Sequence, residues 1–187
     1  MLNIYNIETS NYVNGNGNRF VIWVQGCDLG CVGCWNQQTW SFEEKKIMTP
    51  DSIFEQIKLH YSELDGVTFT GGEPFLQSSD FTKLAYLIKS QLKLPIQVFS
   101  GFNLNEIEDD PAKRELLSLI DILVCGRFDE KKPNNNQTVF HLDKTVEAWQ
   151  FNNSDVEIEF DENNNMKLTG YPKDSLIRSM KDIDDRV

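Results

Sequence analysis

The stretch Phe20-Val21-Ile22-Trp23-Val24-Gln25-Gly26-Cys27 decides the fold of this chain. Its first six residues are almost continuously apolar, a pattern typical of a strand that is covered on both faces. The run stops at Gly26, and Cys27 opens a loop that carries two more cysteines. We therefore expect a buried strand that brings a cysteine-rich loop to one edge of a sheet.

The same order of strand and helix continues downstream. Apolar runs predict strands over residues 67–70, 96–100 and 122–125, and a glycine follows each run. Between them, Thr49-Pro50-Asp51 is a typical helix start, and residues 104–120 form a broken helical stretch. The apolar residues expected to face the core are Ile53, Phe54, Ile57 and Tyr61 in the first helix and Phe81, Leu84, Ala85, Ile88 and Leu92 in the second. This alternation predicts an α/β fold with a parallel sheet and an active site beyond the C-terminal ends of its strands.

The last third of the chain has a different composition. Residues 131–137 form a polar, asparagine-rich loop. Alternating apolar and polar side chains over residues 156–160, followed by residues 166–168, predict a half-exposed β-hairpin. A short helix is expected over residues 174–182, before a solvated acidic end. We predict a core of residues 1–128 and an extension of residues 129–187 that packs on it.

Charge and hydropathy exclude several classes of partner. The chain has 29 acidic and 18 basic residues, a formal net charge of −11, which repels a phosphate backbone and argues against a nucleic-acid partner. No apolar run approaches the roughly 20 residues that span a bilayer. The first residues lack the basic start and apolar stretch of a signal peptide. We therefore expect a cytoplasmic protein that does not bind a membrane.

The cysteines carry the chemical signal. Three of the four form the pattern Cys27-x-x-x-Cys31-x-x-Cys34, and such crowding in a reducing compartment indicates metal or redox chemistry rather than disulfides. Three thiolates can hold three irons of a [4Fe–4S] cube, which leaves the fourth iron open to a substrate. Gly26 and Gly30 ease the curling of such a loop.

A structural zinc site is the main alternative, and it needs a fourth ligand. Cys125 lies some ninety residues away on a predicted strand, where a packing role is expected. His60 and His141 are far apart in the sequence and are expected to be packing or surface residues.

A second motif, Gly71-Gly72-Glu73-Pro74, follows the predicted strand over residues 67–70. Glycine allows close backbone approach to a ligand, and a carboxylate can accept a hydrogen bond from an ammonium group. By itself the motif is more often a plain turn, whereas Ser100-Gly101 at the end of a later strand is equally compatible with a turn and with a ligand contact.

Together these motifs resemble the radical S-adenosylmethionine (SAM) superfamily, oxidoreductases with an incomplete parallel β/α barrel, here with a C-terminal hairpin added. The resemblance implies that the open iron chelates SAM and that one electron splits it to a 5′-deoxyadenosyl radical. Trp35 could lie against the adenine. The resemblance assigns the cluster to Cys27, Cys31 and Cys34, as catalytic and metal-binding residues, and SAM to Gly33, Trp35, Asn36, Gly71, Gly72, Glu73, Pro74, Ser100 and Gly101.

Within that superfamily, the sequence of about residues 10 to 140 is similar to that of the anaerobic ribonucleotide reductase activating proteins. The similar segments are residues 13–19, 25–27, 34–40, 99–102 and 121–128. This resemblance implies a glycyl-radical protein as partner, such as the large subunit of an anaerobic ribonucleotide reductase. It also implies flavodoxin or ferredoxin as electron donor.

The chain departs from that family at three places. Cys125 replaces a usual aspartate, Asn134-Asn135-Asn136-Gln137 is a reduced form of a longer family motif, and about fifty further residues follow. Two alternatives therefore stay open. One is a small radical SAM enzyme with another peptide or metabolite substrate, as in 7-carboxy-7-deazaguanine synthase. The other is a non-catalytic zinc or iron–sulfur module.

Overall fold

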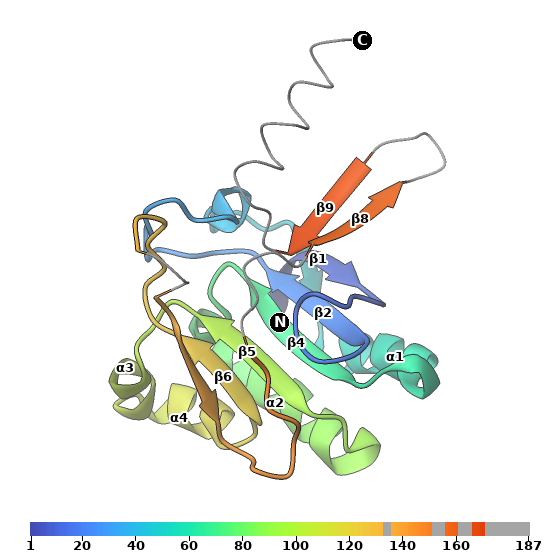
Figure 1. The fold of residues 1–187 in the computed structure, drawn as a ribbon. Helices are drawn as coiled ribbons and strands as arrows, with labels where there is room; N and C mark the ends of the chain where they lie inside the picture. Colours follow the sequence, from blue (N-terminus) through green and yellow to red (C-terminus); the bar gives the residue numbers. More distant parts are fainter. Residues whose placement is uncertain (133–135, 151–155, 161–165, 171–187) are drawn as a thin grey trace.

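A computed structural model describes residues 1–132, 136–150, 156–160 and 166–170, except for the side chains of Glu159 and Lys167. Seven strands form one sheet in the order β3-β1-β2-β4-β5-β6-β7, and two more form a separate hairpin (Figure 1). The strands are β1 (Leu2–Glu8), β2 (Arg19–Val24), β3 (Lys46–Met48), β4 (Gly66–Gly71), β5 (Ile96–Ser100), β6 (Ile122–Cys125), β7 (Thr138–His141), β8 (Val156–Phe160) and β9 (Met166–Gly170).

The centre of the sheet is parallel, as the sequence predicts. Strands β2, β4, β5 and β6 run side by side in this order, and all four correspond to the predicted apolar runs. Val24 pairs with Gly71, and Ser100 pairs with Cys125, so the C-terminal ends of these strands meet at one rim. The predicted α/β class with a largely parallel sheet is confirmed.

The antiparallel strands at the two edges were not expected. β1 pairs with β2 and β3 on one side, and β7 pairs with β6 on the other. These strands have weaker signals because they are short or half-exposed, with polar residues among the apolar ones. β7 lies beyond residue 128, so the sheet continues past the predicted core, and the division of the chain at that residue stays a prediction.

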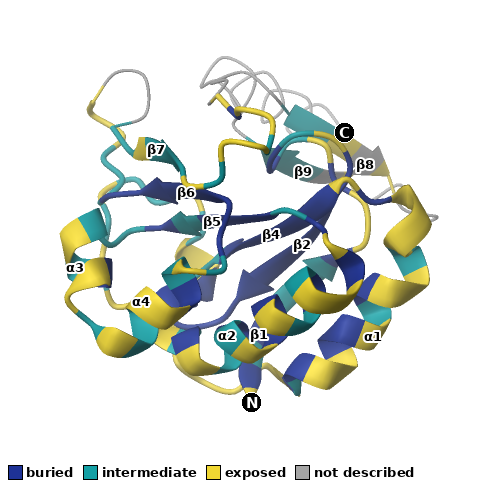
Figure 2. Ribbon diagram, turned by 90° about the horizontal axis from the view of Figure 1, so that it is seen from below, coloured by how far each residue is buried: buried dark blue, intermediate teal, exposed yellow. Residues whose placement is uncertain are grey.

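Helices cover one face of the sheet (Figure 2). They are α1 (Pro50–His60), α2 (Ser78–Leu87), α3 (Leu104–Glu108) and α4 (Pro111–Leu117), with a π-helical turn, η4 (Ile88–Leu92), and 3₁₀ turns η1 (Gln37–Thr39), η2 (Tyr61–Glu63) and η3 (Pro74–Gln77). The hydroxyl of Thr49 accepts a 3.0 Å hydrogen bond from the backbone N–H of Ser52, and Pro50 occupies the first helical position, as predicted.

The apolar faces of these helices build the core against β1, β2, β4, β5 and β6. The predicted core residues of α2 and η4 are all buried, and so are Ile53, Phe54 and Ile57 of α1. The prediction for Tyr61 is wrong, because its side chain is 45% exposed. The α-helix ends at His60 and the chain tightens into η2, which removes Tyr61 from the buried stripe.

The opposite face of the sheet is closed at the N-terminal ends of its strands by the segment that leads into β2. Arg19 is 2% exposed and donates hydrogen bonds to the hydroxyl of Thr68 at 3.1 Å and to the carbonyl of Val67 at 2.7 Å. Thr68 donates in turn to the carbonyl of Asn14 at 2.7 Å. Burial lowers the pKa of Arg19 to about 10, which leaves it charged at neutral pH. We call residues 11–19 the floor segment.

The C-terminal hairpin of β8 and β9 is present with Phe160 opposite Met166, as the alternation predicts. The helix predicted over residues 174–182 lies outside the described residues. In the part of the chain that the structure describes, no helix has the length and apolar character that a membrane span requires.

Candidate active site at the C-terminal rim of the sheet

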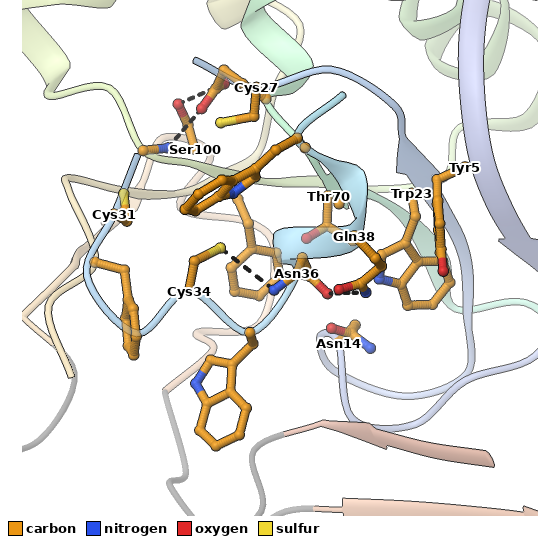
Figure 3. Close-up of a pocket in the computed structure, with 18 of the residues that line it drawn as sticks. Tyr5, Asn14, Trp23, Cys27, Cys31, Cys34, Asn36, Gln38, Thr70 and Ser100 are labelled. Carbon is orange, nitrogen blue, oxygen red and sulfur yellow. Dashed lines mark hydrogen bonds between the residues drawn. The ribbon is translucent and has the colours of Figure 1, made fainter. Parts of the chain in front are cut away.

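A cavity of about 520 Å³ opens where the parallel strands end. Its wall combines the cysteine loop after β2 with the ends of β4 and β5, and β1 and the hairpin close it from the other side (Figure 3). Brought together from distant parts of the sequence, the predicted residues that line it are Cys27, Cys31, Cys34, Trp35, Asn36, Gly71, Gly72, Glu73, Ser100 and Gly101. This is the cavity in which we place the candidate chemistry.

The cysteine loop is fastened at its base and again at Val32, whose carbonyl accepts a 3.3 Å hydrogen bond from the backbone N–H of Glu130. The backbone N–H of Gly26 donates to the carbonyl of Thr39 at 2.7 Å, and that of Cys27 donates to the carbonyl of Trp40 at 3.1 Å. Further along, the sulfur of Cys34 accepts a 3.4 Å hydrogen bond from the backbone N–H of Asn36. Figure 3 shows Cys27, Cys31 and Cys34 spread around the same opening.

Burial favours the neutral form of two thiols of this loop, Cys27 and Cys31. The pKa of Cys27 is raised to about 11, mainly by burial and to a smaller extent by the Glu73 carboxylate and the other two cysteines. Burial also raises the pKa of Cys31, and Cys34 adds to this shift. The thiols therefore influence one another, and a positive charge placed among them would favour their thiolate forms.

Glu73 joins three strand ends. It is 1% exposed, and its carboxylate accepts hydrogen bonds from the backbone N–H of Phe75 at 3.0 Å, from the hydroxyl of Ser100 at 2.9 Å and from the backbone N–H of Gly101 at 2.7 Å. Its own backbone N–H donates to the carbonyl of Gly26 at 2.9 Å. Through its carboxylate and its backbone N–H, Glu73 thus fixes the rims of β4 and β5 against the start of the cysteine loop.

The carboxylate still has capacity for a ligand. A carboxylate offers about four acceptor positions, and the hydrogen bonds from Phe75, Ser100 and Gly101 occupy three of them. Burial raises the pKa of Glu73 to about 7, although its hydrogen bonds and the charge of Arg127 act in the opposite direction. A cationic group bound in the cavity would stabilise the ionised form.

The glycines at the end of β4 allow this strand to lie close to β2 and to the start of the cysteine loop. Gly71 has φ +100°, and a Cβ built there would lie 2.6 Å from the backbone nitrogen of Val24. A Cβ at Gly72 would collide with the carbonyl of Gly26. Larger residues would therefore separate β4 from the cysteine loop.

Arg127 braces the other side of Gly101. Its guanidinium donates to the Gly101 carbonyl and forms a two-pronged ion pair with Glu106, at 3.0 and 2.9 Å. The loop after β5 is thus held from both ends, by Glu73 at its N–H and by Arg127 at its carbonyl.

Comparison with known proteins identifies the family. The family described as a 4Fe-4S single cluster domain matches residues 13–145, which includes the floor segment from Val13, the cysteine loop and the Glu73 rim.

The chain belongs to this 4Fe-4S single cluster domain family.

Curated relatives are similar along most of their length. An anaerobic ribonucleoside-triphosphate reductase-activating protein from Escherichia coli K12 is 30% identical over 155 residues, which cover 75% of this chain and 99% of that protein. Proteins of the same name from Salmonella typhi and Pasteurella multocida are 31% and 29% identical, over 70% of this chain and 92% and 87% of theirs. The crystal structure of QueE from Escherichia coli has a TM-score of 0.46 and 19% identity, over 54% of this chain and 52% of that one, a likeness too low to support a conclusion.

The residues of this 4Fe-4S domain fit a cluster better than a single metal ion. Among the described residues, no three His, Cys, Asp or Glu side chains are gathered as ligands of one ion. A cubane cluster separates its thiolates, because each binds a different iron. The zinc alternative also lacks a fourth cysteine or histidine ligand: Cys125 is 4% exposed within the main core, and neither His60 nor His141 lines the cavity.

Two predicted site residues lie outside the cavity wall. Gly33 has φ +72° and shapes the cysteine loop, where a Cβ would collide with the Glu130 side chain. Pro74 is buried and begins η3. Both shape the backbone beside the cavity, and neither is among the residues that line it.

Sequence reasoning missed the other half of the wall. It includes Trp23, Thr70 and Phe99, which alternate with core residues on the central strands. That alternation could have identified them, because it places them on the face without helices. Gln137, from the reduced asparagine-rich motif, donates to the carbonyls of Ser100 and Gly126 at 3.1 and 2.9 Å. β1 and β9 reach the cavity only through tertiary packing, which left no local signal.

Proposed function

We propose that this protein activates an anaerobic ribonucleoside-triphosphate reductase by installing a glycyl radical on it. The observation that carries the proposal is one cavity lined by three cysteines of a single loop and by the buried Glu73, in a chain of the 4Fe-4S single cluster family. The names of relatives at about 30% identity support the choice of partner.

The cysteines and Glu73 divide the binding work. Cys27, Cys31 and Cys34 would hold a [4Fe–4S] cluster, and the shared cavity leaves space beside them for SAM. When bound, the cluster would supply the electron that splits SAM into methionine and a 5′-deoxyadenosyl radical, which takes a hydrogen atom from a glycine of the partner. Glu73 would accept a hydrogen bond from the SAM ammonium at its remaining acceptor position.

Other residues of the cavity would orient SAM and enclose it. Ser100 and Gly101 are held in place by Glu73 and Arg127, so the rim that faces SAM is preorganised. Trp35 is 45% exposed and lines the cavity, where its ring would cover the adenine. A reduced flavodoxin or ferredoxin would donate the electron from the exposed side of the cysteine loop.

The test is anaerobic reconstitution with iron and sulfide, followed by dithionite and SAM. We expect methionine and 5′-deoxyadenosine, and a glycyl radical in the electron paramagnetic resonance spectrum when the reductase is added. The matched control is Cys31→Ser, which removes one iron ligand. Intact SAM would contradict the radical SAM chemistry, whereas cleaved SAM without a glycyl radical would contradict the partner and favour another substrate.

A further inference from the structure

The hairpin of β8 and β9 lies beyond the part of the chain that the family shares. The family match ends at residue 145, and the hairpin begins at Val156. Even so, Leu168, Thr169 and Gly170 of β9 line the cavity together with the cysteines. An element added to the family domain therefore forms part of the wall of its candidate active site.

The hairpin turns its polar face to the body of the protein. The Asn11 side chain donates to the hydroxyl of Thr169 at 3.3 Å, and the backbone N–H of Tyr12 donates to the carboxylate of Glu157 at 3.3 Å. Glu157 and Thr169 are direct partners in the hairpin register, so they share one face. Hydrogen bonds to the floor segment thus hold the hairpin above β1 and β2 (Figure 1).

The other face of the hairpin is apolar, and it is exposed except at Leu168. Its register pairs Ile158 with Leu168 and Phe160 with Met166. Phe160 is 66% exposed, Met166 is 47% exposed and Ile158 is 43% exposed, while Leu168 reaches the cavity. We call these four residues the hairpin patch. The patch is continuous with the cavity through Leu168, so a molecule that occupies the cavity mouth also meets the patch.

Charge narrows the identity of that molecule. Residues 155–162 carry five carboxylates, at Asp155, Glu157, Glu159, Asp161 and Glu162, and no basic residue. The chain as a whole has a net charge of −11. An apolar surface in an acidic setting suits a protein segment with apolar side chains flanked by lysine or arginine. A small metabolite would fill the cavity without needing a surface of this size.

We propose that the hairpin patch docks the protein substrate, through an apolar segment with basic flanks next to the glycine that becomes the radical. This inference rests on the proposed function, and it names the surface by which the partner is recognised. Docking there would place the segment over the cavity mouth that Leu168 and Gly170 line.

The experiment compares Ile158→Ser/Phe160→Ser with the control Leu59→Ser. Leu59 is an apolar residue that is 81% exposed on α1, on the helix-covered face of the sheet. Each reconstituted protein is first assayed for SAM cleavage without a partner, which normalises for cluster content. The apparent KM for the anaerobic ribonucleoside-triphosphate reductase is then measured from glycyl-radical formation, at about 0.05 M and about 0.3 M salt.

We expect the double variant to raise the KM for the reductase roughly tenfold or more, since exposed aromatic anchors dominate such interfaces. The control should stay within about twofold, as is usual for surface changes away from an interface. Higher salt should raise the wild-type KM. A double variant with an unchanged KM overturns the docking proposal.

Two further outcomes are informative. If truncation after Gly170 alters the KM and the double variant does not, recognition of the reductase depends on residues 171–187 and not on the patch, which also overturns the proposal. If the wild type cleaves SAM and forms no glycyl radical on the reductase, the proposed function fails first, and that result is visible before any variant is compared.

Discussion

The two sides of the cavity are built in opposite ways. On the Glu73 side, three hydrogen bonds converge on one buried carboxylate, and Gly71 and Gly72 leave no room for a side chain. On the cysteine side, the loop is fastened at Gly26 and Cys27, and all three thiols are partly exposed. The hydrogen bonds of the fold thus fix the Glu73 half of the site, while the cysteine half is the one that would hold the cluster. Stability and catalysis should therefore respond differently to changes on the two sides.

The largest effect is expected from Cys31→Ser. Loss of one iron ligand should reduce iron content and bring 5′-deoxyadenosine release to background. The melting temperature of the cluster-free protein should hardly move, because a substitution at a partly exposed loop position costs about 0.5 kcal/mol or less. Iron analysis, product chromatography and calorimetry measure these quantities. A large stability loss would contradict the distinction between the two sides.

Glu73→Ala should instead destabilise the protein even without a cluster. The change leaves the Phe75, Ser100 and Gly101 donors without their acceptor in a buried place, at a cost of about 3 to 5 kcal/mol. Urea unfolding of the cluster-free protein measures this cost. Glu73→Gln is the matched control, since it keeps the shape and one acceptor oxygen and should lose less. Equal stability of the Ala variant and the wild type would show that the brace has no structural role.

The pH dependence of stability should also identify the Glu73 side. The folded protein binds this proton more tightly than the unfolded chain, because burial raises the pKa of Glu73 from 4.5 to about 7. Stability from this group is therefore greatest below pH 4.5 and is lost as the pH rises through 7. Between pH 5 and pH 8 the cluster-free protein should lose about 2 to 3 kcal/mol of unfolding free energy. Glu73→Gln should flatten the difference; an identical slope in that variant would assign the effect to another group.

Arg127→Ala should have the smallest effect. The Arg127–Glu106 pair is 40% and 36% exposed, and exposed ion pairs contribute about 1 kcal/mol or less. We expect a similar melting temperature but a KM for SAM that rises a few fold, because the Gly101 carbonyl loses its partner. Arg127→Lys should restore part of the binding, since it keeps a charged donor. A stability loss as large as that of Glu73→Ala would remove the reason to treat Arg127 as a brace for binding.

Sequence reasoning predicted the centre of the molecule and missed its borders. Apolar runs such as residues 20–25 are easy to predict as strands because both faces of the strand are buried. By contrast, β1 and β7 pair near the edges of the sheet and mix polar with apolar side chains, which weakens their signal. Tyr61 went wrong because a tightened last turn shifts the helical phase. Local sequence patterns thus predict the central strands of the sheet, while the edge strands depend on which of their side chains the rest of the chain buries.

The same division applies to the site. The spacing of the cysteines and the position of Gly71-Gly72-Glu73 at a strand end were enough to bring both motifs to one cavity. The roles of Arg127 and Gln137 were not predictable, because each depends on contacts with backbone carbonyls at the ends of β5 and β6. The β9 wall was hidden for the same reason, since its residues meet the cavity from more than forty positions beyond β6.

The floor segment closes the cavity at the end opposite the rim. Asn14 of this segment lines the cavity and is held by the hydroxyl of Thr68, so among the described residues we place the entrance at the rim, where the parallel strands end. A ligand bound deep in the cavity must then bind before, and leave after, a molecule that covers the rim. For an enzyme whose protein partner covers the cavity mouth, this geometry imposes an ordered mechanism in which the small cosubstrate binds before the protein. Dissociation of the partner is then the step that reopens the cavity for the next turnover.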